Sequence, residues 1–257
     1  RLLGRRERRL LAEEIRVATD TFFRSKEQYL QFGLAYRRGF LFAGPPGCGK
    51  TLTTKVVIST SKAASCVAYS PKEGMREADQ LEEAFTTAQS LAPSILILED
   101  LDKFGRSVPI SRILNLLDGL DTPTGVLVIA TTNEPDRLDP ALLLRPSRFD
   151  RGWTFPLPDY EQRLRFLLKK GHGLFQPRTM EVLAEGSRGF SMAYVQEIFA
   201  TAVALAVGHG GGVNDSDMLR SLEILKKQIK ESGAPLPRVG EIKAPPGFRH
   251  NTEAKTL

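Results

Sequence analysis

The chain has 257 residues, enough for one large domain or for a core with a small satellite domain, and its hydrophobic (41%) and charged (26%) fractions are those of an ordinary globular protein. No apolar run approaches the roughly 20 residues of a membrane-spanning helix, and two cysteines give no disulfide framework, so a cytoplasmic location is expected with no transmembrane segment in this chain; an upstream targeting or membrane segment is the alternative left open. The net charge of +6 includes the basic run Arg1–Arg9, which is more typical of a solvated helix face than of a nucleic-acid site.

Helical and strand-like patterns alternate through the first 156 residues. A helical linker is expected over residues 1–35, with a helical pattern from about Arg5 to Phe32, and an α/β core over residues 36–156. The expected strands are short and apolar: Gly39–Ala43, Ser65–Tyr69, Ile95–Leu98, Val126–Thr131 and Gly152–Phe155. The expected helices lie between them: Lys50–Ser61, Arg76–Leu91, Ile110–Leu117 and a short one around Pro140–Leu144. Because several strands are apolar at every position, the pattern predicts a parallel five-stranded sheet sandwiched by helices.

The strand pattern stops after Pro156-Leu157-Pro158, and four helical segments follow. Asp159 can cap a helix that runs to Lys170, and Pro177 can begin a second helix that Gly186 ends. A third helix is expected from a cap at Ser191 to about Val207, and a fourth from about Ser216 to Lys230. These segments predict a small helical lid domain over residues 157–231. The Pro-rich stretch 232–257 lacks apolar periodicity and is expected to be disordered.

A glycine-rich loop connects the first expected strand to the first core helix. It fits the phosphate-binding pattern G-x-x-x-x-G-K-[ST], and the pattern predicts an ATP site made by Gly44, Pro45, Pro46, Gly47, Cys48, Gly49, Lys50, Thr51 and Leu52. Glycines let backbone N–H groups approach the phosphates, and the start of the following helix adds the positive end of its dipole. Lys50 would reach the β- and γ-phosphates, and the Thr51 hydroxyl would bind Mg²⁺.

Two acids, Glu99 and Asp100, directly follow the apolar strand Ile95–Leu98. Ligands of open α/β sheets bind at the carboxyl ends of the strands. Phosphoryl transfer needs one acid for the Mg²⁺ shell and one group that orients the attacking water. Paired with the glycine loop, the two acids indicate a site for ATP hydrolysis.

Four motifs in fixed order make the chain resemble an AAA+ ATPase of the AAA clade, whose fold is a P-loop NTPase core followed by a helical lid. The motifs are the Walker A loop Gly44–Thr51, the Walker B strand Ile95–Asp100, the region Ala130–Asn133 with Leu138–Arg151, and the lid motif Gly189-Phe190-Ser191. The match covers roughly Tyr36 to Gly208. Within the family, the phrase Tyr36-Arg37-Arg38-Gly39 and the Glu-Asp order of the acids are similar to the branch of the mitochondrial translocase of the Rieske iron–sulfur protein and its bacterial relatives.

The resemblance implies a role for each polar residue. Glu99 takes the Mg²⁺ role and Asp100 the water-orienting role, in an order inverted from that of most relatives, and the shorter Asp100 predicts slow hydrolysis or a compensating approach of the sheet. A shifted register is the alternative, in which Asp100 is the metal-side acid and apolar Leu101 occupies the catalytic position. Asn133 is implied to be the first sensor, which hydrogen-bonds the γ-phosphate or the attacking water.

Arg145 and Arg148 match the positions of arginine fingers, which act on the ATP of a neighbouring subunit and imply a homo-oligomeric ring, usually a hexamer. Surface salt bridges with Asp139 or Asp150 are the alternative role. Asp118-Gly119-Leu120 falls where relatives carry an intersubunit signalling element, and a helix cap by Gly119 is an equal explanation. The two pore segments, Ser70–Met75 and Lys103–Pro109, are short, and the first has no aromatic residue, which argues against the usual grip on a threaded peptide.

Three functions remain open for such a chain. The favoured one is an ATP-driven remodeller or translocase of a protein substrate that the sequence does not identify. The second is a nucleotide-gated assembly switch with weak hydrolysis. The third, a nucleic-acid-dependent ATPase, rests only on the basic residues and would show a steep salt dependence.

Overall fold

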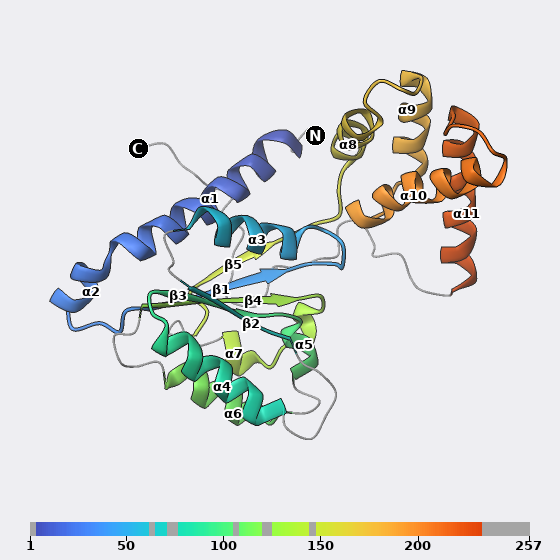
Figure 1. Ribbon diagram of the computed structural model, residues 1–257. Coiled ribbons are helices and arrows are strands. Elements are labelled where there is room, and N and C mark those ends of the chain that lie inside the picture. Colours follow the sequence, from blue (N-terminus) through green and yellow to red (C-terminus); the bar gives the residue numbers. More distant parts are fainter. Residues whose placement is uncertain are drawn as a thin grey trace. The chain divides into compact units, whose positions relative to one another are not determined.

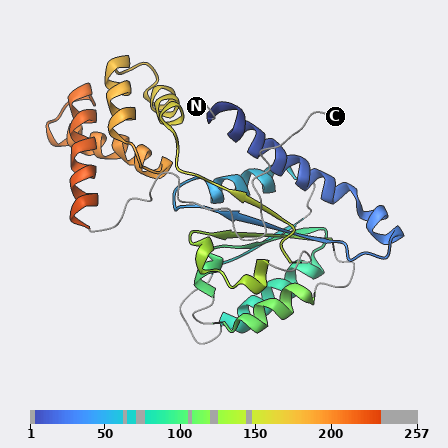
Figure 2. The ribbon, with the colours of Figure 1, turned by 180° about the vertical axis from the view of Figure 1, so that it is seen from behind.

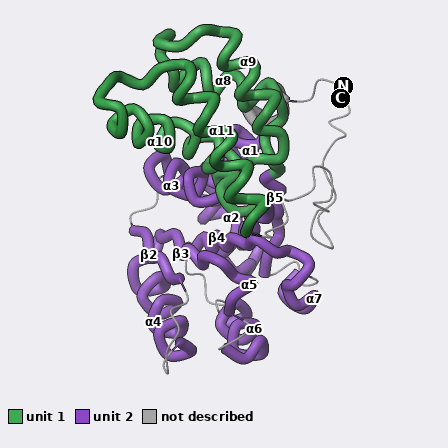
Figure 3. The backbone as a smooth tube through the Cα atoms, turned by 90° about the vertical axis from the view of Figure 1, so that its right-hand side faces the viewer, with its two compact units in different colours: residues 1–9, 45–49, 156–242 green, residues 10–44, 50–155, 243–257 purple. Residues whose placement is uncertain are grey.

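The computed structural model describes residues 4–61, 65–70, 77–104, 108–119, 125–143 and 148–232, with side chains from Leu11 onward. These residues fall into two units, coloured separately in Figure 3. Of the described chain, the sheet unit comprises residues 10–44 and 50–155, and the helical unit comprises residues 4–9, 45–49 and 156–232. The tail beyond residue 232, which was expected to be disordered, lies outside the described residues.

The sheet unit is built on five parallel strands in the order β2-β3-β4-β1-β5 (Figure 1). Their bounds are β1 (Arg37–Ala43), β2 (Ser65–Tyr69), β3 (Ser94–Leu98), β4 (Val126–Thr132) and β5 (Arg151–Thr154). Every residue of β3 and β4 is buried, as their unbroken apolar runs predict for central strands covered on both faces. The predicted parallel five-stranded α/β core is therefore confirmed.

Helices cover both faces of this sheet (Figures 1 and 2). One face carries α3 (Lys50–Thr60) and the part of α1 (Gly4–Arg24) from Leu10 onward, and the other carries α4 (Glu77–Ser90), α6 (Ile110–Asp118) and α7 (Pro140–Leu143). Three shorter pieces complete the unit: α2 (Lys26–Gln31), α5 (Leu101–Phe104) and the 3₁₀ turn Pro135–Arg137. None of the described helices is both long enough and apolar enough to cross a membrane.

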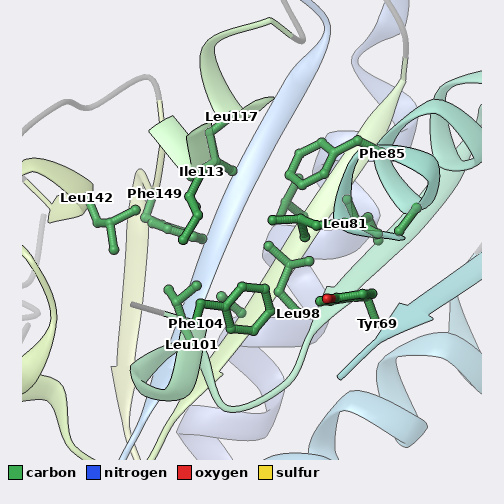
Figure 4. Packing of buried hydrophobic residues seen from close by; sticks show 14 of the residues in the cluster. Tyr69, Leu81, Phe85, Leu98, Leu101, Phe104, Ile113, Leu117, Leu142 and Phe149 are labelled. Atoms are coloured by element: carbon green, nitrogen blue, oxygen red, sulfur yellow. The ribbon is translucent and has the colours of Figure 1, made fainter. Parts of the chain in front are cut away.

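Alternation along β1 places side chains on both sides of the sheet. Leu41 packs into a cluster with residues of α4 and α6, including Phe85 and Ile113, and Figure 4 shows side chains of this cluster. Phe40 and Phe42 point to the opposite face, where their rings meet Trp153 of β5 edge-on. Burial on both sides fixes β1, and hence the loop that follows it.

The helical pattern predicted from Arg5 to Phe32 is interrupted in the structure. Helix α1 ends at Arg24 and α2 begins at Lys26, with Ser25 between them at φ −98° and ψ 13°. The Ser25 N–H bonds to the carbonyl of Phe22, and its hydroxyl donates to the carbonyl of Thr21. A serine side chain that bonds to the preceding turn competes with the regular helical ladder, which explains the break.

The helical unit contains α8 (Tyr160–Gly171), α9 (Pro177–Gly186), α10 (Met192–Gly208) and α11 (Asp215–Glu231). Asp159 and Ser191 cap α8 and α10 as predicted, because their side chains accept the N–H groups of Gln162 and Tyr194. A buried cluster that includes Leu167, Leu183 and Val195 holds the unit together. The four predicted helices are present. The predicted division of the chain into residues 1–35, 36–156, 157–231 and 232–257 stays a prediction.

Candidate functional site

The glycines between β1 and α3 have conformations that other residues avoid. Gly44, Gly47 and Gly49 have φ angles of +150°, +73° and +99°. A Cβ on Gly44 would lie 2.2 Å from the carbonyl oxygen of Phe155, so a side chain there would collide with backbone. The turn therefore depends on glycine, as a loop that brings its backbone close to a phosphate must.

Gly47 also contacts the lid motif inside the helical unit. Its carbonyl accepts the N–H of Ala193 at 3.2 Å, and a Cβ on Gly47 would lie 2.6 Å from Ser191 Oγ. Ser191 is the N-cap of α10. The second glycine of the loop is thus closely packed against the residues that begin this helix.

Helix α3 begins with the two residues predicted to bind the phosphates and the metal. The Lys50 side chain is buried, and its ammonium donates to the carbonyl of Gly44 at 2.5 Å and to Asn133 Oδ1 at 2.8 Å. Thr51 and Leu52 are exposed at the same helix start. A buried ammonium bonded to the Gly44 carbonyl, next to an accessible hydroxyl, fits the triphosphate and Mg²⁺ that the sequence predicts.

The carboxyl ends of β3 and β4 bring the remaining polar residues to the same place. Asp100 follows β3, Asn133 follows β4, and Asn133 Nδ2 donates to Asp100 Oδ1 at 2.8 Å. Lys50, Asn133 and Asp100 therefore form one continuous hydrogen-bonded network, although 83 and 33 positions separate their pairs in the sequence. This is the edge at which open α/β sheets bind ligands.

Asp100 adopts a left-handed backbone conformation, with φ +54°. Aspartate and asparagine are the non-glycine residues that enter this region most easily, so the backbone suits Asp at this position better than Glu. Its second oxygen, Oδ2, accepts the ammonium of Lys103 at 2.6 Å. The inverted acid order thus has a conformational reason at residue 100.

Leu101, which the alternative register would place in the catalytic position, is 2% exposed and packs in the sheet core. A leucine offers no atom that could orient water in either case, so the assignment of Glu99 to the metal side and of Asp100 to the water stays a prediction. Sequence reasoning did not identify Asp102, Thr132 and Lys103, which all hydrogen-bond to this network. Asp102 lies in the same acidic run, two residues after Asp100, and this position in the sequence could have indicated it.

The arginines show a mixed outcome. Arg148 is buried, and its guanidinium pairs with both oxygens of Asp118, at 3.0 and 2.7 Å, and donates to the carbonyl of Ala141. Its partner is thus neither Asp139 nor Asp150, the two alternatives considered. Arg145 lies outside the described residues. Gly119 has φ −68°, so it ends α6 without the left-handed glycine conformation.

Asp150 pairs instead with Arg38, from the phrase that precedes the glycine loop, at 2.5 Å. Burial raises the pKa of Asp150 above its ordinary value, and the Arg38 guanidinium opposes this rise only in part. Of the two pore segments, the structure describes Ser70 in the first, and Lys103, Phe104, Val108 and Pro109 in the second.

Among the described residues, no group of three or more His, Cys, Asp and Glu side chains is arranged to hold a metal ion. Mg²⁺ in nucleotide sites needs fewer protein ligands, because water and phosphate oxygens complete its shell. The assignment of Thr51 and Glu99 to the metal stays a prediction.

Comparison with known proteins, like the geometry, indicates a site for ATP. Residues 40–157 match the sequence model of the ATPase family associated with various cellular activities (AAA). The ATP-dependent zinc metalloproteases FtsH of Acidimicrobium ferrooxidans and Mycoplasmopsis pulmonis are 33% and 32% identical to this chain over 217 residues. These alignments cover 77% and 76% of the chain but 32% and 29% of the two relatives, so the chain spans about a third of their length.

The matched region runs from the middle of β1 to just beyond β5, and so contains the glycine loop, both acids and Asn133. The finer placement beside the Rieske-protein translocase branch stays a prediction. Through this domain the chain belongs to the AAA family of ATPases, enzymes that hydrolyse ATP to ADP and phosphate.

Proposed function

We propose that the chain is the motor part of a homo-oligomeric ring, a hexamer, in which ATP turnover at subunit interfaces drives remodelling or translocation of a protein substrate. The network of Lys50, Asn133 and Asp100 carries the proposal, because it assembles a phosphate-binding cation and a water-orienting acid at one sheet edge. The similarity to relatives whose name is that of proteases supports a protein substrate and a chaperone-like activity. A cytoplasmic location is part of the same proposal.

In this function Lys50 binds the β- and γ-phosphates, and the N–H groups of the glycine loop hold the remaining phosphate oxygens. Thr51 and Glu99 would hold Mg²⁺, which would neutralise charge on those oxygens. Asp100 orients the attacking water. Asn133 is hydrogen-bonded to both Lys50 and Asp100 and holds these two charged groups in position relative to each other. Arg145, Arg148 or both would reach the ATP of the next subunit.

Replacing Asp100 by asparagine tests the proposal. Asp100→Asn keeps the size and the left-handed preference of the side chain but removes the carboxylate that orients water. ATP affinity is expected to stay within about twofold, and turnover to fall by about 10²–10⁴-fold, the usual contribution of general acid–base groups. Binding is measured by calorimetry, and turnover by phosphate release.

Asp79→Asn is the matched control, because Asp79 is an exposed acid of α4 that pairs with Arg112 of α6. This variant should retain wild-type turnover. Unchanged turnover in Asp100→Asn would contradict the assigned role, and absence of turnover in the wild-type oligomer would contradict the motor function.

One observation favours the nucleotide-gated switch as a second candidate. Both oxygens of Asp100 have partners, Asn133 on Oδ1 and Lys103 on Oδ2. The attacking water would therefore have to compete with these side chains for the carboxylate. ATP binding that promotes assembly with negligible turnover in the same assays would identify this function.

A further inference from the structure

Asp102 joins the end of β3 to the end of β4 through a single oxygen. Its Oδ1 accepts the hydroxyl of Thr132 at 2.7 Å and the backbone N–H of Asn133 at 2.9 Å. Both donors lie on the neighbouring strand or directly after it, thirty and thirty-one positions away. A carboxylate that accepts two such bonds makes charge-assisted hydrogen bonds, which are stronger than neutral ones.

The same contacts continue to the far side of Asn133. Thr132 Oγ1, which donates to Asp102, also accepts the N–H of Glu134 at 3.1 Å. Hydrogen bonds therefore hold the chain at three successive residues: at the Thr132 side chain, at the N–H of Asn133 and at the N–H of Glu134. The Asn133 side chain takes no part in this set of bonds, and its amide contacts Lys50 and Asp100 instead.

The element that carries Asp102 is anchored in the core. Helix α5 is a single turn, and its Leu101 and Phe104 are 2% and 1% exposed within the sheet cluster (Figure 4). Asp102 itself is only partly buried and points to the strand ends rather than into this cluster. A side chain fixed at its base in this way can hold its partners with little freedom of its own.

We propose that Asp102 is a positioning residue for hydrolysis: it fixes the main chain around Asn133, so that the Asn133 amide stays aligned between Lys50 and Asp100. This inference rests on the proposed ATPase function of the site. Misplacing a catalytic group by about 1 Å can cost about 10²-fold in rate, so the loss of this support acts on turnover more than on binding.

Asp102→Ala is the direct test, in the whole chain. It is expected to lower kcat for ATP by about ten- to a hundredfold, while KM changes by less than about twofold. Asp102→Asn should restore most of the rate, because the amide oxygen can accept the same two bonds. Thr132→Val, which removes one hydroxyl at similar volume, should lower kcat by a smaller factor in the same direction.

Amide hydrogen exchange gives a readout that does not depend on turnover. In Asp102→Ala the N–H groups of Asn133 and Glu134 should exchange at least about tenfold faster, and in the control Asp79→Ala they should not. Unchanged exchange, or faster exchange with unchanged kcat, would overturn the positioning role. A wild-type chain without turnover would contradict the proposed function, and the exchange rates would still decide whether Asp102 holds Asn133.

Discussion

Asp100 shows how the backbone at one residue can favour one acidic side chain over another. At φ +54° a side chain longer than Asp or Asn loses the local hydrogen bonds that make the left-handed region tolerable. Asp100→Glu is therefore expected to lower the free energy of unfolding by about 1 kcal/mol, measured by urea denaturation.

Asp100→Asn serves as the control for this effect, since asparagine tolerates the same conformation and should leave the free energy of unfolding within about 0.5 kcal/mol. Equal stabilities for Asp100→Glu and the wild type would show that the backbone does not disfavour glutamate. The inverted acid order would then have no conformational basis.

The sequence was sufficient to predict which polar residues meet, but not how each is supported. Lys50, Asp100 and Asn133 were predicted from motif order, and they share one network in the structure. Asp102 was not assigned a role and Lys103 was assigned to a pore segment, because whether an acid or lysine near a strand end turns toward the site depends on the φ of one residue and on a four-residue helix. Neither feature produces a periodic pattern in the sequence.

At the scale of an element, the start of α11 links a helix cap to a histidine. Asn214 and Asp217 form a reciprocal capping box, and Asp217 also lies 3.0 Å from His209 Nε2. Burial opposes ionisation of Asp217, but the N–H of Asn214 and the His209 side chain outweigh it and hold the pKa of Asp217 below its ordinary value.

A pH dependence of stability follows from this lowered pKa. Because the folded state favours the carboxylate, Asp217 contributes stability above its unfolded pKa of about 3.9, and the contribution is lost as pH falls through the lower folded value. Free energies of unfolding measured from about pH 6 downward should show a shallower acid-side decline for Asp217→Asn than for the wild type. Parallel curves would contradict the assignment.

Elements with a long pattern were predicted best. The bounds of β3 and β4 lie within one residue of the predicted ones, because both faces are buried; the differences are the polar end residues Ser94 and Thr132. The break at Ser25 and the cap at Asn214 were missed, since each depends on one side chain bonding to nearby backbone. The strand order could not be derived from the sequence pattern, because it is set by which faces pack rather than by any local signal.

For the whole molecule, the proposed ring makes Arg145 and Arg148 the residues to test. Arg148 is bound within its own chain by Asp118, with 6% of its side chain exposed, so Arg148→Ala would leave Asp118 without this partner. That variant is expected to lose about 1–3 kcal/mol of stability, which would obscure any effect on a neighbouring subunit. Arg145 is therefore the arginine on which to test action between subunits.

Mixing two inactive variants tests the ring directly. Lys50→Ala cannot hold the phosphates but keeps its arginines, whereas Arg145→Ala binds ATP but lacks the finger that would act on its neighbour. Each alone should lose about 10³-fold or more in turnover, and mixed rings should regain activity wherever an intact Arg145 faces an intact Lys50. Phosphate release is measured against the mixing ratio, with ATP binding and assembly of each variant verified first. Because only an interface can combine the two intact halves, a mixture that assembles but stays inactive would show that Arg145 does not act across subunits.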